Sequence, residues 1–196
     1  MPTVIGNFFS FFTILSNVAA MVTFSVGATW ALRQRRDPSQ LEPAWLSTLL
    51  VCVSTYMLVT GVVYGLLLRG VELPQGSTVW WSNEILHVVA PLLVLADVLF
   101  APRRRAMPWK TVLVVAVFPV VWAAYTLIRA NLITAPSTGN TWWYPYPFLD
   151  PRVVGGYGAV SIYIVGIAAA IIGFAALVVW VGHRRACTLQ PRTAVA

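Results

Sequence analysis

Three polar side chains within one apolar stretch have the types and spacing of a catalytic or binding site. Glu84 and His87 are three positions apart and Asn83 precedes His87 by four, so a helix places all three near one face. An imidazole can act as a general base, and a neighbouring carboxylate or amide can orient its ring. Ionisable groups inside an apolar span are costly, which makes these residues site candidates. The alternative for His87 is a packing role with one satisfied ring nitrogen.

A second polar group lies near the start of the chain. Ser10, Thr13, Ser16 and Asn17 recur at spacings of three and four residues in an otherwise apolar segment, which predicts one polar stripe along a helix. A threonine hydroxyl becomes a nucleophile when a base takes its proton. Serine and threonine in membrane helices more often hydrogen-bond backbone or a neighbouring helix, so both interpretations of Thr13 stay open.

The elements that must position these groups are membrane-spanning helices. Hydrophobic residues make up 59% of the chain and charged residues 10%, and the mean hydropathy is +0.77, whereas a soluble domain carries far more charge. The sequence therefore predicts an all-α polytopic membrane helical bundle. A single transmembrane domain is expected over residues 1–186, followed by a short, disordered cytoplasmic tail over residues 187–196. About five segments reach the roughly 20 residues that a span needs, namely 5–32, 44–68, 79–101, 109–133 and 153–182.

Basic residues predict the orientation of this bundle. With the N-terminus outside and the C-terminus inside, ten of the thirteen lysines and arginines face the cytoplasm, whereas the reverse orientation places only three there. Basic cytoplasmic loops beside anionic lipid also account for the net charge of +7. The basic residues form short loop clusters without a DNA-binding motif, so no nucleic-acid partner is expected.

The same topology predicts the depth of the candidate residues. Thr13 precedes Arg33 by twenty residues, or roughly 30 Å of helix, and His87 precedes Arg103 by sixteen, or roughly 24 Å. Helix tilt absorbs such a difference, so the Thr13 hydroxyl and the His87 imidazole are predicted to meet in the outer half of the bundle. Asp97 lies near the cytoplasmic end, where an ion pair with the arginine cluster is expected.

Several kinds of chemistry are excluded. A zinc site needs three or four ligands, and the outer polar cluster offers only Glu84 and His87. The sequence has no nucleophile elbow, phosphate-binding loop or dinucleotide fingerprint. We therefore expect neither a metal nor a cofactor.

Residues 131–152 differ from a minimal connection between spans. They contain four prolines and five aromatic side chains, and proline prevents helix continuation, so irregular structure is expected on the outer face. One interpretation is an aromatic belt at the membrane interface. The other is a lid over an outward-facing pocket.

Three motifs resemble a known family. Residues 7–17 match an FxTxxxN helix, the stretch HVVAPLLVLAD begins at His87 and carries an acid at Asp97, and YPYPFLDP follows near residue 144. These motifs resemble the androgen-induced integral membrane protein family and its bacterial relatives, and the resemblance covers nearly the whole chain. Family members generally have another helix before the threonine helix, whereas this chain begins almost at it.

The resemblance implies an activity and a location. Eukaryotic members are intramembrane threonine hydrolases that cleave fatty acid esters of hydroxy fatty acids, and their functional threonine and histidine would fall on Thr13 and His87. The implied partners are membrane lipid and a lipid ester substrate, in a bacterial cell membrane. His87 would take the proton from Thr13, while Glu84 or Asn83 orients the ring and Asn17 lines the site. The alternative is a non-catalytic membrane protein that binds lipid or acts as a scaffold.

Overall fold

The computed structural model describes residues 2–37, 39–71 and 79–189, and all regular secondary structure within them is helical. Five helical segments are long and apolar enough to cross a membrane: Phe12–Arg33, Ala44–Leu68, Trp80–Phe100, Thr111–Ala130 and Tyr157–Cys187. The predicted all-α polytopic bundle is confirmed, and the chain is a multi-pass membrane protein.

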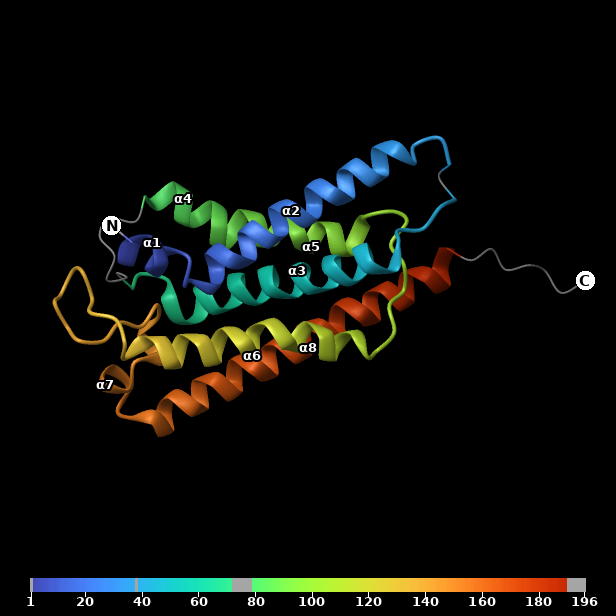
Figure 1. Cartoon of the computed structure of the whole chain (residues 1–196). Helices are drawn as coiled ribbons and strands as arrows, with labels where there is room; N and C mark the ends of the chain where they lie inside the picture. The colour runs from blue at the N-terminus through green and yellow to red at the C-terminus, as the bar shows by residue number, and fades with distance from the viewer. Residues whose placement is uncertain (1, 38, 72–78, 190–196) are drawn as a thin grey trace, which may run out of the picture.

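The spans are helical and are joined by irregular segments (Figure 1). Two of the spans also contain a short turn that is wider than an α-helical turn. In chain order these elements are α1 (Pro2–Phe8), α2 (Phe12–Arg33), α3 (Ala44–Val63), η1 (Tyr64–Leu68), α4 (Trp80–Glu84), η2 (Ile85–Val89), α5 (Ala90–Phe100), α6 (Thr111–Ala130), η3 (Pro147–Leu149), α7 (Pro151–Val154) and α8 (Tyr157–Leu189). Helix α8 continues past the boundary expected at residue 186, and residues 190–196 of the expected tail lie outside the described residues.

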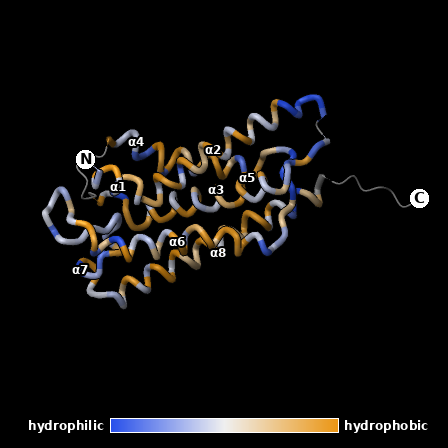
Figure 2. The backbone as a smooth tube through the Cα atoms, viewed as in Figure 1, coloured by the Kyte–Doolittle hydropathy of each residue, from blue (hydrophilic) through white to orange (hydrophobic). Residues whose placement is uncertain are grey.

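Helix α3 forms the centre of the bundle and contacts α2, α5, α6 and α8. In the span that begins with α3, 72% of the most apolar 18-residue stretch is buried inside the protein. The corresponding share in the other four spans is 11–28%. Those four helices carry large exposed apolar side chains, including Leu92, Leu113 and Ile162, and apolar residues colour much of their length (Figure 2). Such an exposed surface suits contact with lipid chains.

Most basic residues gather at one end of the bundle. The end of α2, the connection between α5 and α6, and the end of α8 lie together there (Figure 1). At this end the Arg104 guanidinium contacts the carboxylates of both Asp97 and Glu42. The ion pair expected for Asp97 is therefore confirmed, and it ties the third span to the chain segment that precedes α3.

The first predicted span is broken near its start. The sequence predicts a continuous helix over residues 5–32, but α1 ends at Phe8 and α2 begins at Phe12. Side chains of α6 satisfy polar groups at this break, because the Trp122 indole N–H donates to the Ser10 carbonyl oxygen at 3.0 Å. The Ser10 hydroxyl also lies 3.1 Å from the Tyr125 hydroxyl. Helix α6 therefore stabilises an interruption that hydropathy alone does not reveal.

Two spans contain a wider π-helical turn, η1 and η2, near the end of the bundle opposite the basic cluster. In η2 the Ala90 N–H bonds to the Ile85 carbonyl, five residues back, and Pro91 has no N–H to offer the Leu86 carbonyl. Turns of this kind occur frequently at functional sites. Both of these lie beside the residues that the sequence singled out.

Candidate functional site

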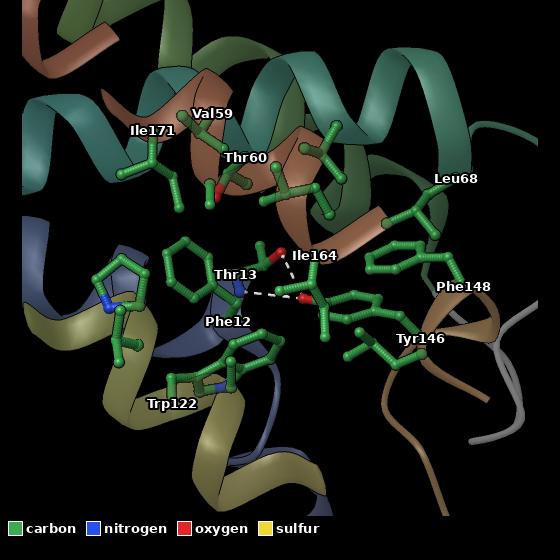
Figure 3. Close-up of a pocket in the computed structure, with 17 residues that line it drawn as sticks. Phe12, Thr13, Val59, Thr60, Leu68, Trp122, Tyr146, Phe148, Ile164 and Ile171 are labelled. Atoms are coloured by element: carbon green, nitrogen blue, oxygen red, sulfur yellow. Dashed lines mark hydrogen bonds between the residues drawn. The ribbon is translucent and has the colours of Figure 1, made fainter. Parts of the chain in front are cut away.

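A cavity of about 120 Å³ lies between α2, α3, α6, α8 and the segment that connects α6 to α7 (Figure 3). Its walls are mostly aliphatic and aromatic side chains, including Phe12, Trp122 and Ile167. The hydroxyl groups on its walls belong to Thr13, Thr60 and Tyr146. The cavity is therefore suited to an apolar molecule with a small polar group.

The cavity reaches the side of the bundle between α6 and α8. Val120 of α6 and Ala168 of α8 both line it and both are exposed on the outer surface. Helix α6 contains Pro119 there, which cannot donate to the Val115 carbonyl four residues back. The Tyr56 hydroxyl donates to that carbonyl instead, at 2.9 Å. The exposed lining residues on this side of the bundle are apolar, as suits contact with lipid chains in a multi-pass protein.

Thr13 is the member of the predicted polar stripe that lies on the cavity. Its side chain is buried, and its hydroxyl oxygen lies 3.3 Å from the Tyr146 hydroxyl. Ser10 instead bonds the Gly6 carbonyl and contacts Tyr125, and the buried Ser16 hydroxyl has no partner among the described residues. Of these three hydroxyl groups, only that of Thr13 lies on the cavity wall, whereas Ser10 and Ser16 are packed elsewhere between helices.

His87 lies in η2, on the neighbouring helix. Its Nδ1 donates to the Asn83 carbonyl oxygen at 2.9 Å, and its ring stacks on Tyr64 with a centroid distance of 4.4 Å. A protonated Nδ1 leaves Nε2 of the neutral ring as the acceptor. Within the described part of the chain the Thr13 hydroxyl bonds Tyr146 and the His87 ring bonds Asn83, with no direct hydrogen bond between the two side chains. Thr13 lines the cavity, whereas His87 is not among its lining residues, and the predicted approach of the two side chains stays a prediction.

Asn17 connects the two helices that carry Thr13 and His87. Its amide nitrogen lies 2.9 Å from the Thr13 carbonyl oxygen and 3.4 Å from the Leu86 carbonyl oxygen. The second of these is the carbonyl that Pro91 leaves without a backbone donor. Asn17 therefore holds the backbone beside His87 against the helix of Thr13.

Asn83 and Glu84 both hydrogen-bond Tyr64, whose ring stacks on His87. The Asn83 amide donates to the Tyr64 hydroxyl at 2.7 Å, and that hydroxyl donates to Glu84 Oε1 at 3.0 Å. Arg69 lies 3.8 Å from the other Glu84 oxygen. The sequence predicts that Glu84 or Asn83 orients the His87 ring. In the structure Asn83 bonds the imidazole through its backbone carbonyl, whereas Glu84 bonds Tyr64.

Part of the segment 131–152 forms one wall of the cavity. Trp143, Tyr144, Tyr146, Phe148 and Leu149 are buried in the protein, and the last three line the cavity. This placement favours the lid interpretation, because an interfacial belt would expose these rings to lipid. Burial raises the pKa of Tyr146, so its phenol stays protonated at neutral pH.

Sequence reasoning missed Tyr64, Thr60 and Tyr146 as site residues. The YPYPFLDP motif contains Tyr146 and was the one signal that could have identified it. Within the described residues, no three His, Cys, Asp or Glu side chains lie together as metal ligands. Comparison of this chain with protein-family models, with curated proteins and with solved structures found no match.

Proposed function

We propose that this protein is an intramembrane lipid ester hydrolase of a bacterial cell membrane, with Thr13 as its nucleophile and His87 as its base. The observation that carries the proposal is the Thr13 hydroxyl on the wall of an apolar cavity that opens sideways between α6 and α8. The ester group of a long-chain lipid fits the polar end of this cavity. Its hydrocarbon chains extend through the opening into the surrounding lipid.

In the proposed reaction the Thr13 oxygen forms a bond to the ester carbonyl carbon while His87 Nε2 takes the hydroxyl proton. The bond to the alkoxy oxygen then breaks, and His87 returns the proton to that oxygen, which releases the alcohol. Water, deprotonated by His87, attacks the acyl-threonine and releases the fatty acid, and Thr13 regains its proton. The net reaction consumes one water and needs no redox partner.

The arrangement of His87 supports its role as a base. Nδ1 is held by the Asn83 carbonyl, which leaves Nε2 available to accept a proton. The Thr13 hydroxyl bonds Tyr146 in this structure, so proton transfer requires a bridging water or a side-chain rotation once substrate enters. Asn17 keeps the two helices together during that change.

The experiment is hydrolysis of a long-chain ester by purified protein in lipid nanodiscs, together with labelling by a fluorophosphonate probe. Thr13→Ala should abolish both, and His87→Ala should lower hydrolysis to a similar floor. The double variant should be little worse than either single variant, because residues that act as one unit give non-additive losses. Ser16→Ala is the matched control, since it removes a buried hydroxyl, one turn along the same helix, that has no hydrogen-bond partner in the described part of the chain. Equal hydrolysis with and without Thr13 would reject the proposal.

The second candidate function is lipid binding without catalysis. The observation in its favour is that the Thr13 hydroxyl bonds a phenol and not an imidazole. A binder should retain a fluorescent fatty acid ester unchanged. In a Cys187→Ser background, which removes the exposed native thiol, the bound ester should protect Val120→Cys from a membrane-permeant maleimide. Retention of intact ester together with no fluorophosphonate labelling at Thr13 would favour this function over hydrolysis.

A further inference from the structure

The Tyr146 hydroxyl contacts two atoms of the same residue. Its oxygen lies 3.3 Å from the Thr13 backbone nitrogen and 3.3 Å from the Thr13 hydroxyl oxygen. The N–H donates to the phenol oxygen, so the phenol proton is free to point toward the Thr13 hydroxyl or toward a ligand. A donor thus lies within hydrogen-bond distance of the proposed nucleophile (Figure 3).

The Thr13 N–H is available because the first span is broken. In a continuous helix this N–H would bond the carbonyl of Phe9, but α2 begins at Phe12 and the N–H belongs to its first turn. The first N–H groups of a helix have no partner within the helix and favour negative charge. The break therefore supplies a second donor beside the nucleophile.

Packing fixes the Tyr146 ring in place. The ring stacks on Phe148 at a centroid distance of 5.2 Å and meets the edge of Phe11 at 5.4 Å. Its side chain is buried, and its hydroxyl faces the cavity (Figure 3). A donor held close to its final position by packing needs little reorganisation when charge develops in a transition state, and here the Thr13 N–H has only to exchange the phenol oxygen for the oxyanion.

The cavity also holds an unsatisfied polar group. Thr60 lines it from α3, and its hydroxyl is buried without a partner among the described residues. A hydroxyl in this position can donate to, or accept from, a polar group of a molecule that enters the cavity. Thr60, Thr13 and Tyr146 are the side chains that offer hydroxyl groups to such a group.

We propose that the Tyr146 hydroxyl and the Thr13 backbone N–H together bind the carbonyl oxygen of the ester and stabilise it as an oxyanion. This inference rests on the proposed hydrolase function. When the Thr13 oxygen bonds the carbonyl carbon, the π electron pair moves to the carbonyl oxygen, which displaces the phenol oxygen from the Thr13 N–H. Both donors then point at that oxygen, and the pair returns to carbon when the alkoxy group leaves.

The test compares Tyr146→Phe with Tyr144→Phe in lipid nanodiscs. Tyr144 is buried in the same segment, but its hydroxyl accepts from Asn131 at 3.5 Å and does not contact Thr13. Tyr146→Phe should lower kcat about 10²- to 10³-fold with KM nearly unchanged, as for the loss of one oxyanion donor. Tyr144→Phe should keep the wild-type kcat.

A second measurement separates catalysis from packing. A long-chain trifluoromethyl ketone forms a tetrahedral adduct with a nucleophilic hydroxyl, so Tyr146→Phe should weaken its inhibition by about the factor lost in kcat/KM. An ether analogue that has no carbonyl should bind both proteins equally. Thermal melting of both variants provides the measure of folding.

The outcomes distinguish the two proposals. If Tyr146→Phe retains the kcat of Tyr144→Phe, or if ketone and ether lose affinity equally, Tyr146 is not an oxyanion donor and the hydrolase proposal stands alone. If the wild-type protein neither hydrolyses ester nor reacts with fluorophosphonate, both proposals fail. A loss confined to kcat and to the ketone supports the inference.

Discussion

Asn17 compensates for a proline on another helix, and this shows how single residues set the geometry of the site. Pro91 removes the N–H that would have served the Leu86 carbonyl, and the Asn17 amide supplies a replacement from α2. The same amide bonds the Thr13 carbonyl. One side chain thus links the backbone of the proposed nucleophile to the turn that carries the proposed base.

Replacement of Asn17 by leucine should therefore affect both stability and activity. We expect Asn17→Leu to lower the free energy of unfolding by about 1 kcal/mol, because it leaves the half-buried Leu86 carbonyl without this donor. Ester hydrolysis should fall as well, since the helices of Thr13 and His87 lose their shared bond. Reversible unfolding in mixed micelles measures the first effect and nanodisc assays the second. Thr29→Val, which removes a bond within α2 alone, is the control, and equal losses in the two variants would contradict this account.

The site residues were only partly predictable at this scale. Helical spacing placed Thr13 and Asn17 on one face, and Asn17 does contact the helix of His87. Tyr146 and Tyr64 could not be found by spacing, because each reaches its partner from a different element. Their contacts depend on how the chain folds back on itself, which local periodicity does not encode.

At the scale of elements, the lengths of the spans followed from the sequence but their interruptions did not. The hydropathy averaged over a segment indicates whether that segment favours lipid over water. It contains no information on which backbone N–H and C=O groups are hydrogen-bonded. The break before α2 is stabilised by Trp122 of α6, and the turn η2 depends on Pro91 together with Asn17. These interruptions require partners from other helices, so they appear only in the assembled bundle.

The crossing of α3 and α5 depends on a glycine. A Cβ atom added at Gly61 would lie 3.0 Å from the Pro91 Cβ and 3.3 Å from the His87 carbonyl oxygen. Small residues allow helices in membranes to approach closely, and here they let η2 pack against α3. The position of His87 therefore depends on the absence of a side chain at residue 61.

Gly61→Ala should push the two helices apart and lower both melting temperature and hydrolysis. A forced methyl in a packed interface costs about 1–3 kcal/mol, which corresponds to several degrees in melting temperature. Gly27→Ala is the matched control, because a Cβ there meets nothing within 4 Å and alanine favours the helix. Thermal unfolding followed by circular dichroism measures both variants. An unchanged melting temperature for Gly61→Ala would show that the crossing does not depend on close approach.

At the scale of the whole molecule, the bundle separates two ends with different chemistry. The basic end is held by Arg104, which contacts Glu42 and Asp97, and burial raises the pKa of Glu42 even though Arg104 lowers it. The cavity, the two π-helical turns and the buried aromatic segment lie toward the other end. The sequence predicted this separation because charge marks the ends of spans, whereas the cavity depends on packing among four helices.

The distribution of charge predicts how the whole molecule sits in its membrane. Arginine and lysine in short loops stay on the cytoplasmic side, so the end that holds the connection between α5 and α6 should face the cytoplasm. The wall formed by residues 131–152 should face outward. In a Cys187→Ser background, which removes the exposed native thiol, Ser137→Cys should react with an impermeant maleimide in intact cells. Ser39→Cys should react only after the membrane is permeabilised, and labelling in the opposite pattern would reverse the orientation and place the cavity toward the cytoplasm.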